Sequence, residues 1–262
     1  MRPGRQAGAF ASPADHLAMQ PIDEPPLTAA LIRARYDALL ERLRAAAESA
    51  GRDEDALQVV AVSKGFGAGA VREAFTAGLR RFGENRVQEA LPKLAAVPDA
   101  EWHLVGRLQA NKARAAIRAF TVIHSVDSLD LLARLDRIAA EESRAPRVLL
   151  QVNVTAEPTK AGFALDEFAA AARQSGPLSD AIGRLAAVRL VGLMTIGEAG
   201  VAAEASRRTF ATLRRLRDEL EHLIGRPLPE LSMGMTADAE AAAAEGATLV
   251  RVGTAIFGPR PA

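Results

Sequence analysis

Short, nearly continuous apolar runs alternate with longer amphipathic stretches along most of this chain, and that alternation restricts its fold more than any other feature. The eight runs cover residues 58–63, 79–83, 102–106, 121–126, 148–154, 189–194, 230–233 and 248–252. Strands that are apolar on both faces are typical of a parallel sheet covered by helices. Eight of them, separated by seven helical stretches, predict an α/β fold, a single closed (β/α)₈ TIM barrel; an open doubly wound sheet is the alternative.

An extra helix is expected before the first strand. Thr28 can act as its N-cap, and the helical pattern ends near residue 51. Its apolar stripe consists of Leu31, Leu39, Leu40 and Leu43. The chain has 262 residues, which is close to the roughly 250 residues typical of such barrels. We therefore expect one barrel domain over residues 28–262.

Residues 1–27 mix proline, glycine, alanine and charged residues without periodicity. They lack the continuous apolar segment of a secretory signal, and we expect a disordered N-terminal extension. A transit peptide is the alternative, although Asp15, Asp23 and Glu24 count against it. Met19 is an alternative start, and the cytoplasm is the expected location.

Composition excludes several classes of site and partner. The chain has no cysteine, which excludes disulfides and thiolate metal sites. The four histidines show no metal-ligand spacing, so we expect no metal. No apolar run approaches the ~20 residues of a membrane helix. A net charge of +1 singles out neither nucleic acid nor membrane. The arginines within 207–217 share their predicted helix with Glu204, Asp218, Glu219 and Glu221, as on a solvated, partly paired face.

The first predicted strand leads into Lys64. Only four of the 33 basic residues are lysines, so a lysine at the end of a predicted strand is unusual in this chain. In a barrel of this kind the chemistry lies at the C-terminal ends of the strands. A partly desolvated amine there can form a Schiff base, which arginine cannot do. The alternative is a rim lysine that reaches solvent or pairs with a carboxylate.

Small residues close the last two predicted strands. Ser232 and Gly234 lie at the end of the run 230–233, and Gly253 and Thr254 follow the run 248–252. Barrels often bind phosphate at this place through backbone N–H groups and the start of a short helix. A glycine after a strand is often only a turn, so the two loops together are a stronger signal than either alone.

Six stretches follow one another along the chain: AVSK (61–64), FGENRVQEA (82–90), WHLVGRLQANK (102–112), GLMTIG (192–197), SMGMTADAEAA (232–242) and RVGTAIFG (251–258). In this order they resemble the pyridoxal phosphate homeostasis proteins, barrels related to the N-terminal domain of bacterial alanine racemases. The chain departs from that family at Gly65-Phe66-Gly67, which replaces a run containing proline. Thr236 stands where serine is common, and Ala239 where a larger apolar residue is common.

The resemblance implies that the cofactor is pyridoxal 5′-phosphate and that seven residues contact it: Lys64, Asn85, Ser232, Gly234, Arg251, Gly253 and Thr254. Lys64 would hold it as a Schiff base, with Asn85 beside it. Arg251 would face the pyridine nitrogen. Ser232, Gly253 and Thr254 would hold the phosphate, and Gly234 would let the backbone approach it.

Some of these residues have structural alternatives. Asn85 precedes a predicted helix and could be its cap. His103 lies within a strand, where a hydrogen-bonded core histidine is the simpler interpretation. Met194, Met233 and Met235 are most simply packing residues. His103, Gln109, Asn111 and Lys112 match a family signature without an assigned role.

Two further lysines bear on the release of a covalently held ligand. Lys93 falls in a predicted helix and should face away from the mouth of the barrel. Lys160 lies in a turn-rich loop near the rim. It is a candidate second amine for the ligand, or it only adds positive charge that attracts an anion.

The expected function is that of a carrier or reservoir in intracellular pyridoxal 5′-phosphate homeostasis, and not of an enzyme. An arginine against the pyridine nitrogen disfavours ring protonation and weakens the cofactor as an electron sink. Alanine racemases add an acid/base tyrosine from a second domain, whereas the single tyrosine here is Tyr36 in the first helix. We expect a monomer or weak dimer with apo enzymes as recipients. The alternatives are a pyridoxal-phosphate-dependent racemase or lyase, and a class I aldolase.

Overall fold

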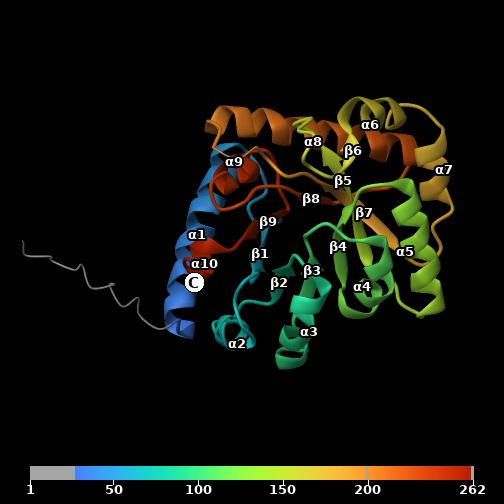
Figure 1. The fold of residues 1–262 in the computed structure, drawn as a ribbon. Helices are drawn as coiled ribbons and strands as arrows, with labels where there is room; N and C mark the ends of the chain where they lie inside the picture. Colours follow the sequence, from blue (N-terminus) through green and yellow to red (C-terminus); the bar gives the residue numbers. More distant parts are fainter. Residues whose placement is uncertain (1–26, 199, 261–262) are drawn as a thin grey trace, which may run out of the picture.

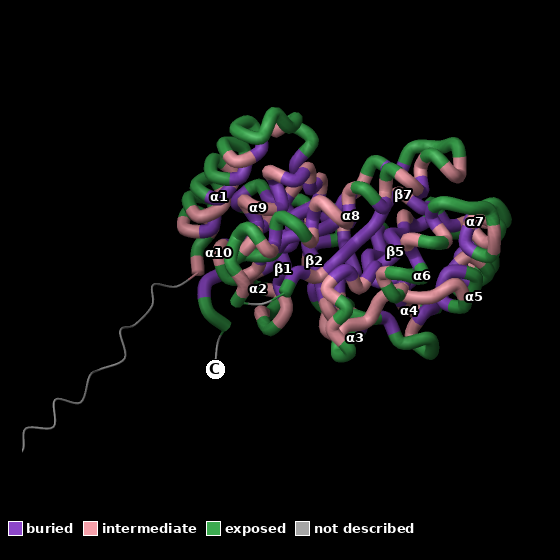
Figure 2. Tube along the Cα trace, turned by 90° about the horizontal axis from the view of Figure 1, so that it is seen from above, coloured by how far each residue is buried: buried purple, intermediate pink, exposed green. Residues whose placement is uncertain are grey.

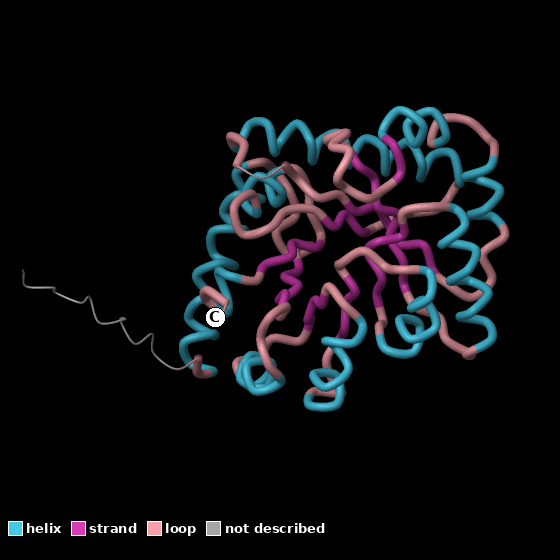
Figure 3. The backbone as a smooth tube through the Cα atoms, in the orientation of Figure 1, coloured by secondary structure: helices cyan, strands magenta, loops and turns pink. Residues whose placement is uncertain are grey.

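The computed structural model describes residues 27–198 and 200–260. Eight parallel strands close into a barrel, and the pairing of β4 with β5 completes the ring (Figures 1 and 3). The strands are β1 (Gln58–Val62), β2 (Arg81–Glu84), β3 (Glu101–Leu104), β4 (Val122–Val126), β5 (Arg147–Asn153), β7 (Arg189–Met194), β8 (Glu230–Ser232) and β9 (Leu249–Val252). The predicted closed barrel is confirmed, and the open sheet is wrong.

The strands differ from the prediction in two places. Leu79 does not begin β2, because its N–H bonds the carbonyl of Ala74 in the turn that ends the preceding helix. A short additional strand, β6 (Phe163–Ala164), pairs with the end of β5. It was not predicted, since two residues carry too little periodicity to be recognised.

Helices occupy all seven connections between the barrel strands. They are α2 (Ala68–Thr76), α3 (Val87–Ala96), the 3₁₀ turn η1 (Ala110–Lys112) with α4 (Ala113–Ala119), α5 (Leu129–Glu141), α6 (Leu165–Ala171) with α7 (Pro177–Gly183), α8 (Ala203–Ile224) and α9 (Ala239–Ala244). The four-residue helix α10 (Thr254–Phe257) follows β9.

The predicted extra helix, α1 (Ala29–Ser49), begins after Thr28, whose hydroxyl accepts from the N–H of Leu31. Its buried stripe contains Ile32 in place of the predicted Leu31. The helix lies between α2 and α9 (Figure 1), bonded to α2 through Ala29 N and Glu73 at 2.8 Å. Because α10 is too short to cover the seam between β9 and β1, α1 takes the place of the eighth outer helix.

The predicted extension at residues 1–27 lies outside the described residues except for Leu27. That residue packs against the hydrophobic core, and the boundary between extension and barrel domain stays a prediction. In the part of the chain that the structure describes, no helix is long and apolar enough to cross a membrane.

The strands bury both of their faces, as Figure 2 shows for the centre of the molecule. Val59 and Ala61 belong to the large cluster between barrel and helices, whereas Val60 belongs to a small separate cluster. Because side chains alternate along a strand, Val60 and its neighbours fill the barrel interior. The other buried members of this inner cluster are Val122, Leu149, Met194 and Leu249.

Candidate functional site

A cavity of about 620 Å³ lies at the C-terminal ends of the strands. Its lining includes five cationic side chains, from Lys64, Arg107, Lys160, Arg251 and Arg260. Within residues 27–198 and 200–260, no carboxylate, histidine or tyrosine lines it. The cavity therefore attracts anions, and its size falls in the usual range for small-molecule sites, roughly 300–1,000 Å³.

Lys64 lies in this cavity, two residues beyond the end of β1. Its side chain is half-buried, and its ε-amine makes no hydrogen bond or ion pair to the rest of the described chain. The predicted alternative of a lysine paired with a carboxylate is wrong. A half-buried amine without a partner is available to a ligand.

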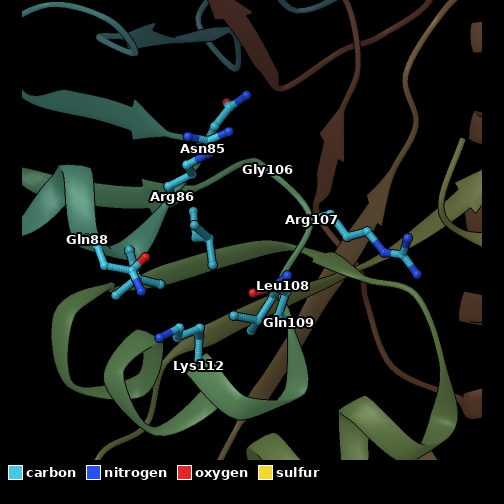
Figure 4. A pocket seen from close by; sticks show the side chains of 10 residues that line it. Asn85, Arg86, Gln88, Gly106, Arg107, Leu108, Gln109 and Lys112 are labelled. Atoms are coloured by element: carbon cyan, nitrogen blue, oxygen red, sulfur yellow. The ribbon is translucent and has the colours of Figure 1, made fainter.

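Asn85 also lines the cavity. The N-cap of α3 is Arg86, which makes no side-chain cap bond, so the alternative that Asn85 caps this helix is wrong. Asn85 and Gly106 lie at the border with a second, smaller pocket of about 350 Å³ (Figure 4). Here Gln88 from α3 and Lys112 from η1 lie on the same side of the view, while the Arg107 side chain extends away from them.

Of the family signature, Gln109 and Lys112 therefore belong to this second pocket. Asn111 lies between them in η1 but does not line it. Like the main cavity, the second pocket has no acidic side chain in its described lining.

Arg251 reaches the cavity from β9 and is 5% exposed. Its Nη1 donates to the hydroxyl of Ser232 at 2.6 Å, and its Nη2 donates to the carbonyl of Thr195 at 2.8 Å. Burial lowers the pKa of Arg251 to about 10, so the guanidinium stays charged at neutral pH. Two hydrogen bonds hold it at the cavity wall.

Ser232 is placed differently from its predicted role. It is fully buried in β8 and does not line the cavity. Besides accepting from Arg251, its hydroxyl lies 2.7 Å from Nδ1 of His124. A side-chain hydroxyl engaged on both sides in the barrel interior is not presented to a ligand in the cavity.

Gly234 does not line the cavity either. Its φ is +86°, and a Cβ there would lie 2.5 Å from Cβ of Ala242 in α9. The position requires glycine for the turn after β8 and for close packing of α9. The predicted approach of its backbone to a phosphate stays a prediction.

Gly253 and Thr254 do line the cavity, as predicted. A Cβ on Gly253 would lie 3.0 Å from the carbonyl oxygen of Val62, directly before the loop that carries Lys64. Thr236, from the loop after β8, lines the same cavity and is exposed to it. Two threonines, Thr236 and Thr254, thus line the cavity, whereas Ser232 does not.

A buried charged cluster lies next to Lys64. Lys93 is 4% exposed; its Nζ donates to Glu84 Oε1 at 2.6 Å and to the carbonyl of Ser63 at 2.8 Å. The Ser63 hydroxyl donates to the same Glu84 oxygen. Lys93 is outside the cavity lining, in agreement with the prediction, but it points inward to the ends of β1 and β2. The reason is that Glu84 is buried and needs a counter-charge.

Lys160 lines the cavity, as expected from its loop, and is already engaged. Its Nζ is bonded to Glu157, to the hydroxyl of Thr155 at 3.3 Å and to the carbonyl of Gly197 at 3.0 Å. These contacts lower the pKa of Glu157 through the hydrogen bond from the lysine. Lys160 would have to leave three partners before it could react as an amine.

The remaining structural alternatives are confirmed. His103 is a buried, hydrogen-bonded histidine. Met194 and Met233 are fully buried, and Met235 lies at the cavity rim. Four arginines of α8 form ion pairs, for example Arg207 and Arg214 with Glu245 at 3.0 and 2.7 Å.

Several lining residues were missed in the sequence. Gln151 is a polar residue inside the apolar run of β5, and its amide donates to the carbonyl of Ala161 at 2.6 Å. A polar residue within an apolar strand could have identified Gln151 as a candidate lining residue. Arg107 and Arg260 lie in loops, where a chain rich in arginine offers no pattern that sets them apart.

Residues 35–261 match the family described as alanine racemase, N-terminal domain. The chain is 45% identical over 221 residues to the pyridoxal phosphate homeostasis protein of Pseudomonas aeruginosa, which covers 84% of this chain and 91% of that protein. The Escherichia coli protein of the same name is 37% identical over 229 residues, with 84% and 93% covered.

Solved structures agree. PipY of Synechococcus elongatus, determined with PLP bound, has a TM-score of 0.74 and 42% identity, and covers 87% of this chain and 100% of that one. An alanine racemase of Clostridium difficile shares the fold with a TM-score of 0.69 at 14% identity; 90% of this chain matches 58% of that one. The chain belongs to the alanine racemase N-terminal domain family and, within it, to the pyridoxal phosphate homeostasis proteins.

Proposed function

We propose that this protein binds pyridoxal 5′-phosphate in the 620 Å³ cavity, covalently through Lys64, and acts as a carrier or reservoir of the cofactor without turning over a substrate. The observation that carries the proposal is the unpartnered, half-buried amine of Lys64 inside a cavity walled by cations. Relatives named pyridoxal phosphate homeostasis protein, and PipY with PLP bound, support it.

The residues present fit the cofactor at its three functional groups. Lys64 would hold the cofactor at its aldehyde, because a free lysine amine is the side chain that can bind an aldehyde covalently. Thr236 and Thr254, with the backbone of Gly253, hold the phosphate. Arg251 would face the ring nitrogen, and as a cation that only donates hydrogen bonds it would favour the unprotonated form of that nitrogen. When bound, the cofactor supplies an aldehyde that amines can exchange.

A carrier fits this lining better than a catalyst does. Racemisation needs an acid and a base on opposite faces of the substrate carbon. Apart from Lys64, the described lining offers Lys160, which is held by three partners, and arginines. The single tyrosine, Tyr36, packs in α1 against the core.

The test is to locate the cofactor on the chain. Purified protein is loaded with pyridoxal 5′-phosphate, reduced with borohydride and digested, and the modified lysine is identified by mass spectrometry. We expect the label on Lys64, and loss of the reducible visible band in Lys64→Ala but not in the matched rim variant Lys112→Ala. A colourless protein that takes up no cofactor would disprove the proposal and favour the aldolase alternative.

Catalysis is tested separately. We expect no racemase, lyase or decarboxylase activity on the common amino acids. Saturable turnover that disappears in Lys64→Ala would show an enzyme and overturn the carrier role. Delivery to apo forms of pyridoxal-phosphate-dependent enzymes and a cytoplasmic location stay predictions.

A further inference from the structure

A line of polar side chains crosses the barrel interior, where barrels of this kind usually hold layers of aliphatic residues. Alternation along the strands places Glu101 and His103 of β3, His124 of β4, Ser232 of β8 and Arg251 of β9 on the inward face, because their neighbours belong to the outer hydrophobic cluster. His103, His124 and Ser232 are fully buried. Such a row costs desolvation energy unless every member is hydrogen-bonded.

The row is continuously bonded. Glu101 Oε1 lies 2.8 Å from His103 Nε2, and His103 Nδ1 lies 2.8 Å from His124 Nε2. His124 Nδ1 lies 2.7 Å from the Ser232 hydroxyl, which in turn lies 2.6 Å from Nη1 of Arg251. The row therefore runs from the start of β3, at the N-terminal end of the barrel, to the wall of the cavity.

The groups at the two ends of the row determine which atom donates and which accepts in every hydrogen bond between them. At one end, the hydrogen bond from His103 lowers the pKa of Glu101 to about 2, so this carboxylate only accepts. At the other end, a guanidinium only donates.

Between these ends, burial lowers the pKa of His103 and of His124, so each ring carries one N–H. His103 must then donate from Nε2 to Glu101 and accept at Nδ1 from His124. His124 accepts at Nδ1 from Ser232, whose oxygen accepts from Arg251.

We propose that Ser232, His124 and His103 are positioning residues, which hold the Arg251 guanidinium against the part of the cavity that receives the ring nitrogen of the cofactor. This inference rests on the proposed function. The single proton of the Ser232 hydroxyl is committed to His124, and its oxygen accepts from Arg251. Ser232 therefore acts through Arg251 and not on the phosphate. This positioning role also gives a function to His103, which belongs to the family signature at residues 102–112.

The first experiment compares two ligands: pyridoxal 5′-phosphate and its analogue with a carbon in place of the ring nitrogen. Ser232→Ala should weaken the cofactor about ten-fold, the usual scale for losing a hydrogen bond to a charged group, and should leave the analogue nearly unchanged. The matched variant Thr254→Ala should weaken both alike. If Ser232→Ala weakened both ligands equally, Ser232 would be a phosphate or merely structural residue, and the inference would be wrong.

The second experiment needs neither ligand nor a folded variant. Nitrogen NMR of the imidazoles in the cofactor-free protein should show His103 and His124 both as Nε2–H tautomers, with a through-bond coupling between His103 Nδ1 and His124 Nε2. An Nδ1–H tautomer at either residue would overturn the inference. If the wild-type protein bound no cofactor while these tautomers were present, the proposed function would fail and the bonded row would stand.

Discussion

At the strand ends, some side chains line the cavity and their immediate neighbours support its wall. Lys64, Thr236 and Thr254 are presented to the cavity. Ser63, only one residue before Lys64, is fully buried and bonded to Glu84. Neighbouring residues therefore have different tasks, and side chains of the two groups should respond differently to substitution.

The phosphate contacts give a residue-scale prediction. Removing the hydroxyl of Thr236 or Thr254, by substitution with Ala, should weaken pyridoxal 5′-phosphate by ~1–3 kcal/mol, because a charged phosphate loses a hydrogen bond. Binding of pyridoxal, which has no phosphate, should hardly change. Parallel titrations with the two ligands measure this, and an equal loss for both would place the phosphate elsewhere.

Lys93 gives a second residue-scale prediction, for stability. Lys93→Met leaves the buried carboxylate of Glu84 without its counter-charge, and breaking a buried pair in this way costs ~3–5 kcal/mol. Urea unfolding should show that loss, whereas Lys112→Met at the rim should stay within about 0.5 kcal/mol. A small effect of Lys93→Met would mean that Glu84 does not depend on Lys93 as its counter-charge.

At the scale of elements, two carboxylates have similarly lowered pKa values in different surroundings. Glu101 lies at the start of β3, and Glu142 lies at the end of α5, next to α4. Hydrogen bonds from His103 to Glu101, and from Arg118 and Arg114 to Glu142, lower the pKa of each carboxyl to about 2. Glu101 is half-buried between strands. Glu142 pairs with arginines on the helical surface, where salt screens charges strongly.

The resulting prediction concerns pH. Because the folded pKa of Glu101 lies below the ordinary value of 4.5, its stabilisation is complete above about pH 4.5 and is lost as the pH falls towards 2. Glu101→Gln should therefore be less stable than wild type at neutral pH, and the difference should shrink on acidification. Urea unfolding at several pH values measures it.

Glu142→Gln is the control. Its difference from wild type should diminish in high salt, whereas that of Glu101→Gln should persist. A pH-independent difference for Glu101→Gln would contradict the low pKa.

At the scale of the whole molecule, the barrel is closed by its own chain, with α1 as the eighth outer helix. Among the described residues, the only large apolar side chains that are exposed are Leu91 at 51% and Met235 at 37%. Met235 lines the cavity. The described surface therefore has no extended apolar patch that a second copy of the chain would cover.

We therefore predict a monomer. Light scattering of the purified protein should give a mass near 27.7 kDa over a broad range of concentration. A mass near twice that value, independent of concentration, would show a stable dimer.

The sequence by itself determined the architecture and placed five of the seven predicted site residues on the cavity wall, because local periodicity and family motifs mark the strand ends. Apolar runs mark the strands, and the carboxyl ends of parallel strands meet at one rim. Lys64, Asn85, Arg251, Gly253 and Thr254 were therefore found from strand ends and family motifs, and all of them line the cavity.

Only the tertiary structure decided the partners of polar side chains that are far apart in the chain. The family resemblance assigned Ser232 to the phosphate. In the folded chain its hydroxyl is hydrogen-bonded to His124 and Arg251, which the barrel brings to it from other strands. Lys93 was expected to face away from the mouth of the barrel, and only the folded chain shows that it pairs with the buried Glu84. A hydroxyl or an amine carries no pattern that names its partner, since a hydrogen bond depends on positions in space that only the closed barrel brings together.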